Sequence, residues 1–112
     1  MKPARAPSLA AMATHADAAA RLLRALANPH RLMVLCVLSE GELAVGELNE
    51  RVPLSQSALS QHLAVLREDG LVATRREAQA VFYRLNPGPA PAIIRTLHDL
   101  YCGPRGRRRS AS

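Results

Sequence analysis

The segment that most constrains this chain is residues 54–70, LSQSALSQHLAVLREDG, in which leucines recur at intervals of four and three residues. That spacing places Leu59, Leu63 and Leu66 on one face of a helix, and such an apolar stripe must pack against other parts of the chain. Ser55 can cap the start of this helix, and Gly70 can end it. The segment therefore predicts a surface helix with one buried face.

The opposite face of the predicted helix is polar, without the Lys/Glu pairs that solubilise an idle surface. Its side chains are Gln56, Ser57, Ser60, Gln61 and Arg67. Glutamine and serine can hydrogen-bond to the edges of DNA bases, and arginine can bind phosphates. The alternative interpretation is an ordinary solvated helix face. The neighbouring elements of the chain are needed to choose between this interpretation and a DNA-binding face.

Three helices are predicted before this segment. Leucines and alanines at helical spacing indicate a first helix over 17–27. Asn28-Pro29 ends it and starts the second, because asparagine favours the capping position and proline the first helical position. The second helix extends to about Ser39. A short third helix fits 45–51 and ends before Pro53, since the residue preceding a proline avoids helical geometry.

Two strands and one more helix are predicted after the segment. Residues 71–76 and 81–86 have strand character, with apolar and polar side chains alternating in the second run, and residues 77–80 join them in a hairpin. A proline-rich break at 86–91 separates the hairpin from a last helix over about 92–101. The fold is therefore expected to be mainly α-helical with a small β-hairpin.

The chain length of 112 residues suits about one domain. We assign that domain to residues 15–102, with a flexible tail at 1–14 and a basic, flexible tail at 103–112. No apolar run approaches the roughly 20 residues of a membrane-spanning helix, and the N-terminus lacks the leucine-rich core of a signal peptide. We therefore expect a cytoplasmic protein without a membrane partner, whose two cysteines are reduced at rest.

The net charge of +6 is unevenly distributed along the chain. Residues 1–50 carry five basic and five acidic side chains, whereas residues 51–112 carry ten basic and four acidic ones. This excess indicates a polyanionic partner, and nucleic acid is favoured over a membrane because no basic amphipathic helix is present. The arginines of the C-terminal tail contribute part of the excess and could be only a solvated end.

A short helix, a turn containing Pro53 and a longer helix with a polar face form a helix-turn-helix, to which the basic hairpin adds a wing. We predict that the longer helix enters the major groove of double-stranded DNA, while the wing arginines reach phosphates or the minor groove. The predicted DNA-binding residues are Ser55, Gln56, Ser57, Ser60, Gln61, Arg67, Arg75, Arg76 and Gln79. A winged helix used only for protein contacts is the alternative.

Residues 54–85, LSQSALSQHLAVLREDGLVATRREAQAVFYRL, resemble the DNA-binding core of the ArsR-type bacterial repressors. ALANPHRL, at 25–32, resembles the end of that family's leading helix, and the resemblance extends over 17–102. It implies a winged helix-turn-helix of four helices, a hairpin and a last helix, and a homodimer built on the first and last helices. Such a dimer reads a pseudo-palindromic operator with half-sites about one helical turn apart, and an effector releases it.

Many ArsR-type proteins sense metals, but both metal sites known in the family are incomplete here. One family site lies in a segment that resembles the pattern ELCVCDL. The corresponding residues 42–48 of this chain read ELAVGEL, with Ala44 and Gly46 in place of thiolates. The other site uses Asp and His residues around the last helix, where only His98 and Asp99 occur. Adjacent residues point in different directions on a helix. We therefore predict no metal and no other cofactor, with a metal-responsive repressor as the alternative.

Two cysteines, Cys36 and Cys102, remain to be explained. Taken alone, Cys36 lies in an apolar helix, RLMVLCVLSEG, where a thiol usually packs as a small hydrophobe. The pair of positions resembles the persulfide-responsive branch of the family, which includes regulators of sulfide oxidation and biofilm growth. That resemblance implies that reactive sulfur species link the two thiols through a di- or polysulfide bridge, and that the linked form releases DNA. Incidental cysteines are the alternative.

A thiol enzyme is not expected, because Cys36 lies in the middle of a helix rather than at a helix N-terminus or beside a base. A disulfide needs Cα atoms about 4.4–6.8 Å apart, so a pair held farther apart could still accept a bridge lengthened by extra sulfur atoms. The exposed setting of Cys102, near Arg105, favours attack by its thiolate, whereas an apolar setting disfavours the thiolate of Cys36. We therefore expect Cys102 to react first.

Overall fold

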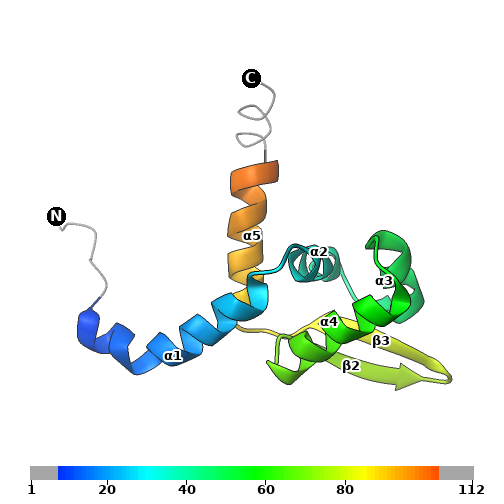
Figure 1. The fold of residues 1–112 in the computed structure, drawn as a ribbon, viewed down its shortest axis with the longest axis horizontal. Coiled ribbons are helices and arrows are strands. Elements are labelled where there is room, and N and C mark those ends of the chain that lie inside the picture. Colours follow the sequence, from blue (N-terminus) through cyan, green and yellow to red (C-terminus); the bar gives the residue numbers. More distant parts are fainter. Residues whose placement is uncertain (1–7, 104–112) are drawn as a thin grey trace.

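The computed structural model describes residues 8–103, which form a winged helix-turn-helix (Figure 1). In chain order the elements are α1 (Leu9–Leu26), α2 (Pro29–Leu38), β1 (Leu43–Ala44), α3 (Val45–Arg51), α4 (Gln56–Glu68), β2 (Val72–Glu77), β3 (Ala80–Leu85) and α5 (Pro89–Cys102). In Figure 1, α1 and the β2–β3 hairpin extend in opposite directions, and α5 stands away from both. None of the helices between residues 8 and 103 is long and apolar enough to span a membrane.

Helices α2 and α4 begin where the sequence provides side-chain caps. The side chain of Asn28 accepts hydrogen bonds from two backbone amides at the start of α2, at 2.9 and 3.1 Å, and Pro29 takes the first helical position. In the same way, Ser55 Oγ accepts a hydrogen bond from the Ala58 amide at 3.1 Å and starts α4. Both predicted caps are confirmed, as is the short helix over 45–51.

The hairpin belongs to a three-stranded antiparallel sheet with the strand order β1-β3-β2. β2 pairs with β3 along its whole length, so only Ala78 and Gln79 form the turn, and Ala78 adopts a positive φ of 55°. The turn is thus shorter than the predicted one over 77–80. β1 pairs Leu43 with Tyr83, and it was not predicted because a two-residue strand has no periodic pattern.

A single hydrophobic core joins the helices to the sheet. The leucine stripe of α4 lies inside it, with Leu59, Leu63 and Leu66 no more than 1% exposed. This burial confirms the predicted inner face of α4 and turns its polar residues toward solvent. The core residues are Ala25, Leu26, Val34, Leu35, Leu38, Leu48, Val52, Leu59, Leu63, Leu66, Leu71, Val72, Ala90 and Ile94.

The first helix is longer than the sequence predicted. α1 begins at Leu9 rather than Asp17, because Ser8 Oγ accepts a hydrogen bond at 3.2 Å from an amide of the first turn. The alanine-rich stretch that follows has high helix propensity and needs no apolar face to remain helical in continuity with the rest of α1. The expected flexible tail over 1–14 is therefore wrong for residues 9–14.

The last helix also starts earlier, at Pro89 instead of about residue 92. Pro89 and Pro91 lie in its first turn, where backbone amides have no helical partner, so the missing N–H groups cost little. α5 continues to Cys102, which places the second cysteine on the helix itself. The remaining parts of the predicted tails, 1–7 and 104–112, lie outside the described residues.

Candidate nucleic-acid interface and thiol site

The turn between α3 and α4 fixes the orientation of the candidate DNA-reading face. Val52 is completely buried in this turn, and Asn49 Nδ2 donates a hydrogen bond to the Leu54 carbonyl oxygen at 2.9 Å. The predicted base- and phosphate-contacting residues of this region are all exposed: Ser55, Gln56, Ser57, Ser60, Gln61 and Arg67. The fold therefore brings them together on the side of α4 that lies away from its buried leucines.

Arg75, which the sequence assigned to a phosphate contact, is held by carboxylates within the protein. Its guanidinium lies 2.8 Å from Glu42, just before β1, and 2.8 Å from Glu77, and it stacks 4.5 Å above the ring of Phe82. Its hydrogen bonds to Glu42 lower the pKa of that carboxyl and raise the pKa of Arg75. Arg75 thus fastens the entry of β1 to the hairpin, and this pairing competes with the phosphate contact.

The other two predicted wing residues, Arg76 and Gln79, are exposed. Gln79 lies in the two-residue turn, and Arg76 lies on β2 two residues before that turn. Within residues 8–103, Arg76 takes part in no ion pair. Of the two arginines predicted to contact DNA from the wing, Arg76 is therefore the one whose charge is available to a polyanion.

Cys36 and Cys102 line the same cavity, between α2 and α5. Its volume is about 200 Å³, and its lining residues are Leu32, Met33, Cys36, Ile94, Leu97, His98 and Cys102. Cys36 is half-buried on α2, Cys102 is exposed at the end of α5, and both are free thiols. Packing of α5 against α2 therefore brings together the two cysteines that the sequence singled out.

The surroundings of Cys36 disfavour its thiolate. Burial raises the pKa of Cys36 above its ordinary value, and the nearby Cys102 and Glu40 raise it further. The backbone carbonyl of Cys36 accepts hydrogen bonds from the amide and the hydroxyl of Ser39, at 3.2 and 2.5 Å, where α2 ends. Cys36 therefore ionises less readily than an ordinary thiol, and it faces a small cavity.

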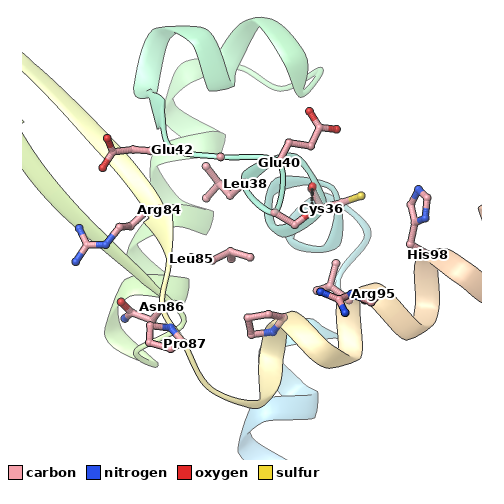
Figure 2. Close-up of a pocket in the computed structure, with 14 residues that line it drawn as sticks. Cys36, Leu38, Glu40, Glu42, Arg84, Leu85, Asn86, Pro87, Arg95 and His98 are labelled. Carbon is pink, nitrogen blue, oxygen red and sulfur yellow. Dashed lines mark hydrogen bonds between the residues drawn. The ribbon is translucent and has the colours of Figure 1, made fainter.

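A second, larger cavity lies on another side of Cys36 (Figure 2). It has a volume of about 800 Å³ and lies between the end of α2, β3 and the start of α5. Cys36, Ile94 and His98 line both cavities and so form the wall between them. Sequence reasoning missed this wall, although the spacing of Ile94, His98 and Cys102 by four residues places all three on one face of a helix.

The histidines of the helical core region pack against each other. His30 on α2 and His62 on α4 have ring centroids 5.8 Å apart. Burial lowers the pKa of His62, and the charges of Arg31 and His30 lower it further. Over residues 8–103, no group of three or more His, Cys, Asp or Glu side chains is placed to hold a metal ion. Ala44 and Gly46 bring no donor side chain to the start of α3.

Comparison with known proteins points to bacterial transcriptional regulators. Residues 28–74 match the family model described as bacterial regulatory protein, arsR family. The chain is 62% identical over 81 residues to the transcriptional activator HlyU of Vibrio cholerae, which covers 72% of this chain and 75% of that protein. It is 48% identical over 96 residues to the biofilm growth-associated repressor of Agrobacterium fabrum, and the match covers 86% of this chain and 82% of that protein. The crystal structure of the repressor BigR from Xylella fastidiosa superposes on this chain with a TM-score of 0.80 at 42% identity. The match covers 86% of this chain and 98% of that one.

Proposed function

Because the chain belongs to the ArsR family of DNA-binding transcriptional regulators, we propose that it represses transcription and leaves its operator when Cys36 and Cys102 are joined through sulfur. Its relatives are regulators and not enzymes, so no residue is assigned a catalytic role. One observation carries the proposal: the two thiols line a single cavity between α2 and α5. A bridge across that cavity would connect the second helix to the last.

The proposed oxidant is a hydropersulfide, RSSH. The thiolate of Cys102 attacks its outer sulfur, a new S–S bond forms, the S–S bond of the donor breaks, and RS⁻ leaves. The Cys36 thiolate then attacks the sulfur bound to Cys102 and expels HS⁻, which closes a disulfide. If Cys36 has already taken a sulfur from a second donor, the same attack by its persulfide closes a trisulfide. The donors supply every oxidising equivalent.

The order of attack follows from exposure and ionisation. Cys102 is exposed, whereas burial holds the pKa of Cys36 above its ordinary value. Since the thiolate is the nucleophile, Cys102 takes the first sulfur. In Cys102→Ser protein, persulfide should therefore form on Cys36 more slowly than on Cys102 in the native protein. Formation on Cys36 at the native rate would refute this order.

Release from DNA needs a link between Cys36 and the reading face, and residues 39–42, which follow α2, supply one. Glu40 forms an ion pair with Arg51 at the end of α3, at 3.1 Å. Glu42 forms an ion pair with Arg75 of the wing, at 2.8 Å. We infer that a bridge drawing the end of α2 toward α5 shifts this segment and changes the placement of both α3 and the wing. The bridged protein, with α3 and the wing in this altered placement, would then bind DNA less tightly.

Double-stranded DNA is the proposed partner, with the polar face of α4 in the major groove and Arg67 and Arg76 on phosphates. A homodimer joined through α1 and α5 would present two such helices to a pseudo-palindromic operator. Because phosphate contacts release counterions, the affinity for DNA should fall steeply as salt concentration rises. Failure to bind upstream DNA at low salt would instead favour a winged helix used for protein contacts.

The decisive experiment combines mass spectrometry with operator binding after treatment with glutathione persulfide. We expect a linked peptide that contains Cys36 and Cys102 with additional sulfur, together with loss of DNA affinity. Hydrogen peroxide serves as the comparison oxidant and should give no linked species with extra sulfur. The Cys36→Ser/Cys102→Ser double variant should bind the operator normally and keep its affinity in persulfide. Release of that double variant by persulfide would contradict the proposal.

A further inference from the structure

The 800 Å³ cavity beside Cys36 has the size of a small-molecule site, whereas the 200 Å³ cavity shared with Cys102 does not. The smaller cavity can hold a short chain of sulfur atoms but not a donor molecule. The larger one could admit a donor of tripeptide size, because sites for small molecules usually measure about 300–1,000 Å³. Since Cys36 lies in the wall between them, a donor in the larger cavity would meet the same thiol that faces the bridge.

The larger cavity is lined by two carboxylates and two arginines. Its two carboxylates are engaged by arginines that do not line it: Glu40 pairs with Arg51, and Glu42 pairs with Arg75. Its own two arginines, Arg84 and Arg95, form no ion pair with any residue from 8 to 103. The charge of Arg84 also acts on Glu42, so Arg95 is the lining arginine that remains for an anionic ligand.

Figure 2 shows how these groups are distributed. Arg95 and His98 come from α5 on the side of the cavity where the sulfur of Cys36 lies, whereas Arg84 and Glu42 lie at the opposite end. Arg95 and Cys36 line the same cavity, so a carboxylate bound to Arg95 would share that cavity with the thiol. The remaining walls near Leu38, Leu85 and Pro91 are apolar and suit the carbon skeleton of a carrier.

We propose that this cavity is a docking site for a low-molecular-weight hydropersulfide whose carrier bears carboxylates, with Arg95 as its anchor and Cys36 as the sulfur acceptor. The inference rests on the proposed function and names the donor class for the second thiol. The Cys36 thiolate attacks the outer sulfur of RSSH, the S–S bond of the donor breaks, and RS⁻ leaves through the open cavity. The product is Cys36–SSH, the species that closes a trisulfide with persulfidated Cys102.

The test measures how fast Cys36 gains one sulfur in full-length Cys102→Ser protein, followed by mass spectrometry. The two probes are glutathione persulfide, whose carrier bears carboxylates, and cysteamine persulfide, whose carrier bears an ammonium group. Each rate is divided by the rate for the same donor with urea-unfolded protein, which removes differences in intrinsic reactivity. The variants are Arg95→Gln and, as the matched control, Arg24→Gln, which removes an equal charge from α1.

We expect Arg95→Gln to slow sulfur transfer from glutathione persulfide about tenfold, the effect of losing one charge-assisted hydrogen bond. Transfer from cysteamine persulfide should not slow, and Arg24→Gln should slow neither donor. An equal loss with both donors, or no loss with either, would overturn the docking site. A different result would contradict the proposed function: the native protein forms the bridge and still keeps its affinity for DNA.

Discussion

At the scale of single residues, the proposed sulfur chemistry depends on the contrast between two thiols that line one cavity. Cys102 is exposed and meets any oxidant in solution, whereas Cys36 is half-buried with a raised pKa. A thiol that stays protonated is a poor nucleophile toward dilute oxidants. It can still attack a persulfide held beside it, because proximity replaces a bimolecular encounter. The ionisation of Cys36 therefore controls how fast the proposed bridge closes.

Replacing Glu40 with glutamine should make Cys36 more reactive. The charge of Glu40 is one cause of the raised pKa of Cys36, so its removal lowers that pKa and increases the thiolate fraction at a given pH. The measurement is the pH dependence of iodoacetamide alkylation in Cys102→Ser protein, whose midpoint should move to lower pH. Glu50→Gln, on the exposed side of α3, is the control and should leave the midpoint in place. An unmoved midpoint in the Glu40 variant would contradict this electrostatic effect.

At the scale of elements, strand β2 of the wing carries two arginines: Arg75 is held in ion pairs, whereas Arg76 forms none with any residue from 8 to 103. Arg76→Gln should weaken binding to operator and random DNA alike and reduce the slope of log affinity against log salt by about one, the effect of one lost phosphate contact. Arg75→Gln should change this slope less, because its guanidinium is already paired with Glu42 and Glu77. Fluorescence anisotropy over a salt series measures both slopes. A larger change for Arg75→Gln would show that its ion pairs open on DNA.

The packing of α2 against α4 should weaken in acid because of the paired histidines. Burial keeps the pKa of His62 below its ordinary value in the folded protein, so the unfolded chain binds a proton more readily. Stability should accordingly fall as pH drops through about 6.5, the unfolded value. His62→Gln should reduce this pH dependence, which thermal unfolding at pH 7.5 and pH 5.5 would detect. Equal losses on acidification in both proteins would place the effect elsewhere.

The elements that the sequence predicted well are those with local signals. Asn28-Pro29 and Ser55 fixed two helix starts, and the spacing of Leu59, Leu63 and Leu66 fixed the buried face of α4. The missed features depend on contacts between distant segments. β1 exists because it pairs with β3, and Arg75 is diverted by Glu42, which lies 33 positions away.

The thiol site shows the same difference between features that have a local sequence signal and features that depend on contacts between distant segments. Cys36 and Cys102 could be paired from the sequence only through the family resemblance, because no local pattern connects them. The cavity beside Cys36 could not be predicted at all, since it is assembled from the end of α2, β3 and the start of α5. Its arginines were counted in the sequence as part of a general basic excess. Only the folded structure shows that Arg84 and Arg95, unlike Arg51 and Arg75, form no ion pair within residues 8–103.

At the scale of the whole molecule, the two helices that flank the winged core carry large apolar side chains in solvent. Leu9 is 84% exposed and Leu23 56% on α1, while Leu100 is 52% and Tyr101 72% exposed on α5. Exposed apolar side chains gathered on particular elements mark interaction surfaces. Both helices extend away from α4 and the β2–β3 hairpin in Figure 1. A second copy of this chain seated on them would leave both reading faces free, which is the arrangement that a pseudo-palindromic operator requires.

Leu23→Glu and Leu100→Glu should therefore separate the proposed dimer without unfolding the protomer, since neither side chain belongs to the buried core. Sedimentation velocity should show the mass falling from two chains to one, and Val65→Glu, at an exposed apolar position on α4, should leave the mass unchanged. Binding to DNA with a single half-site should persist. Affinity for a full operator should fall at least 100-fold, because linked half-site binding typically adds a factor of about 10²–10⁴. A monomeric variant that kept full operator affinity would show that one reading helix suffices.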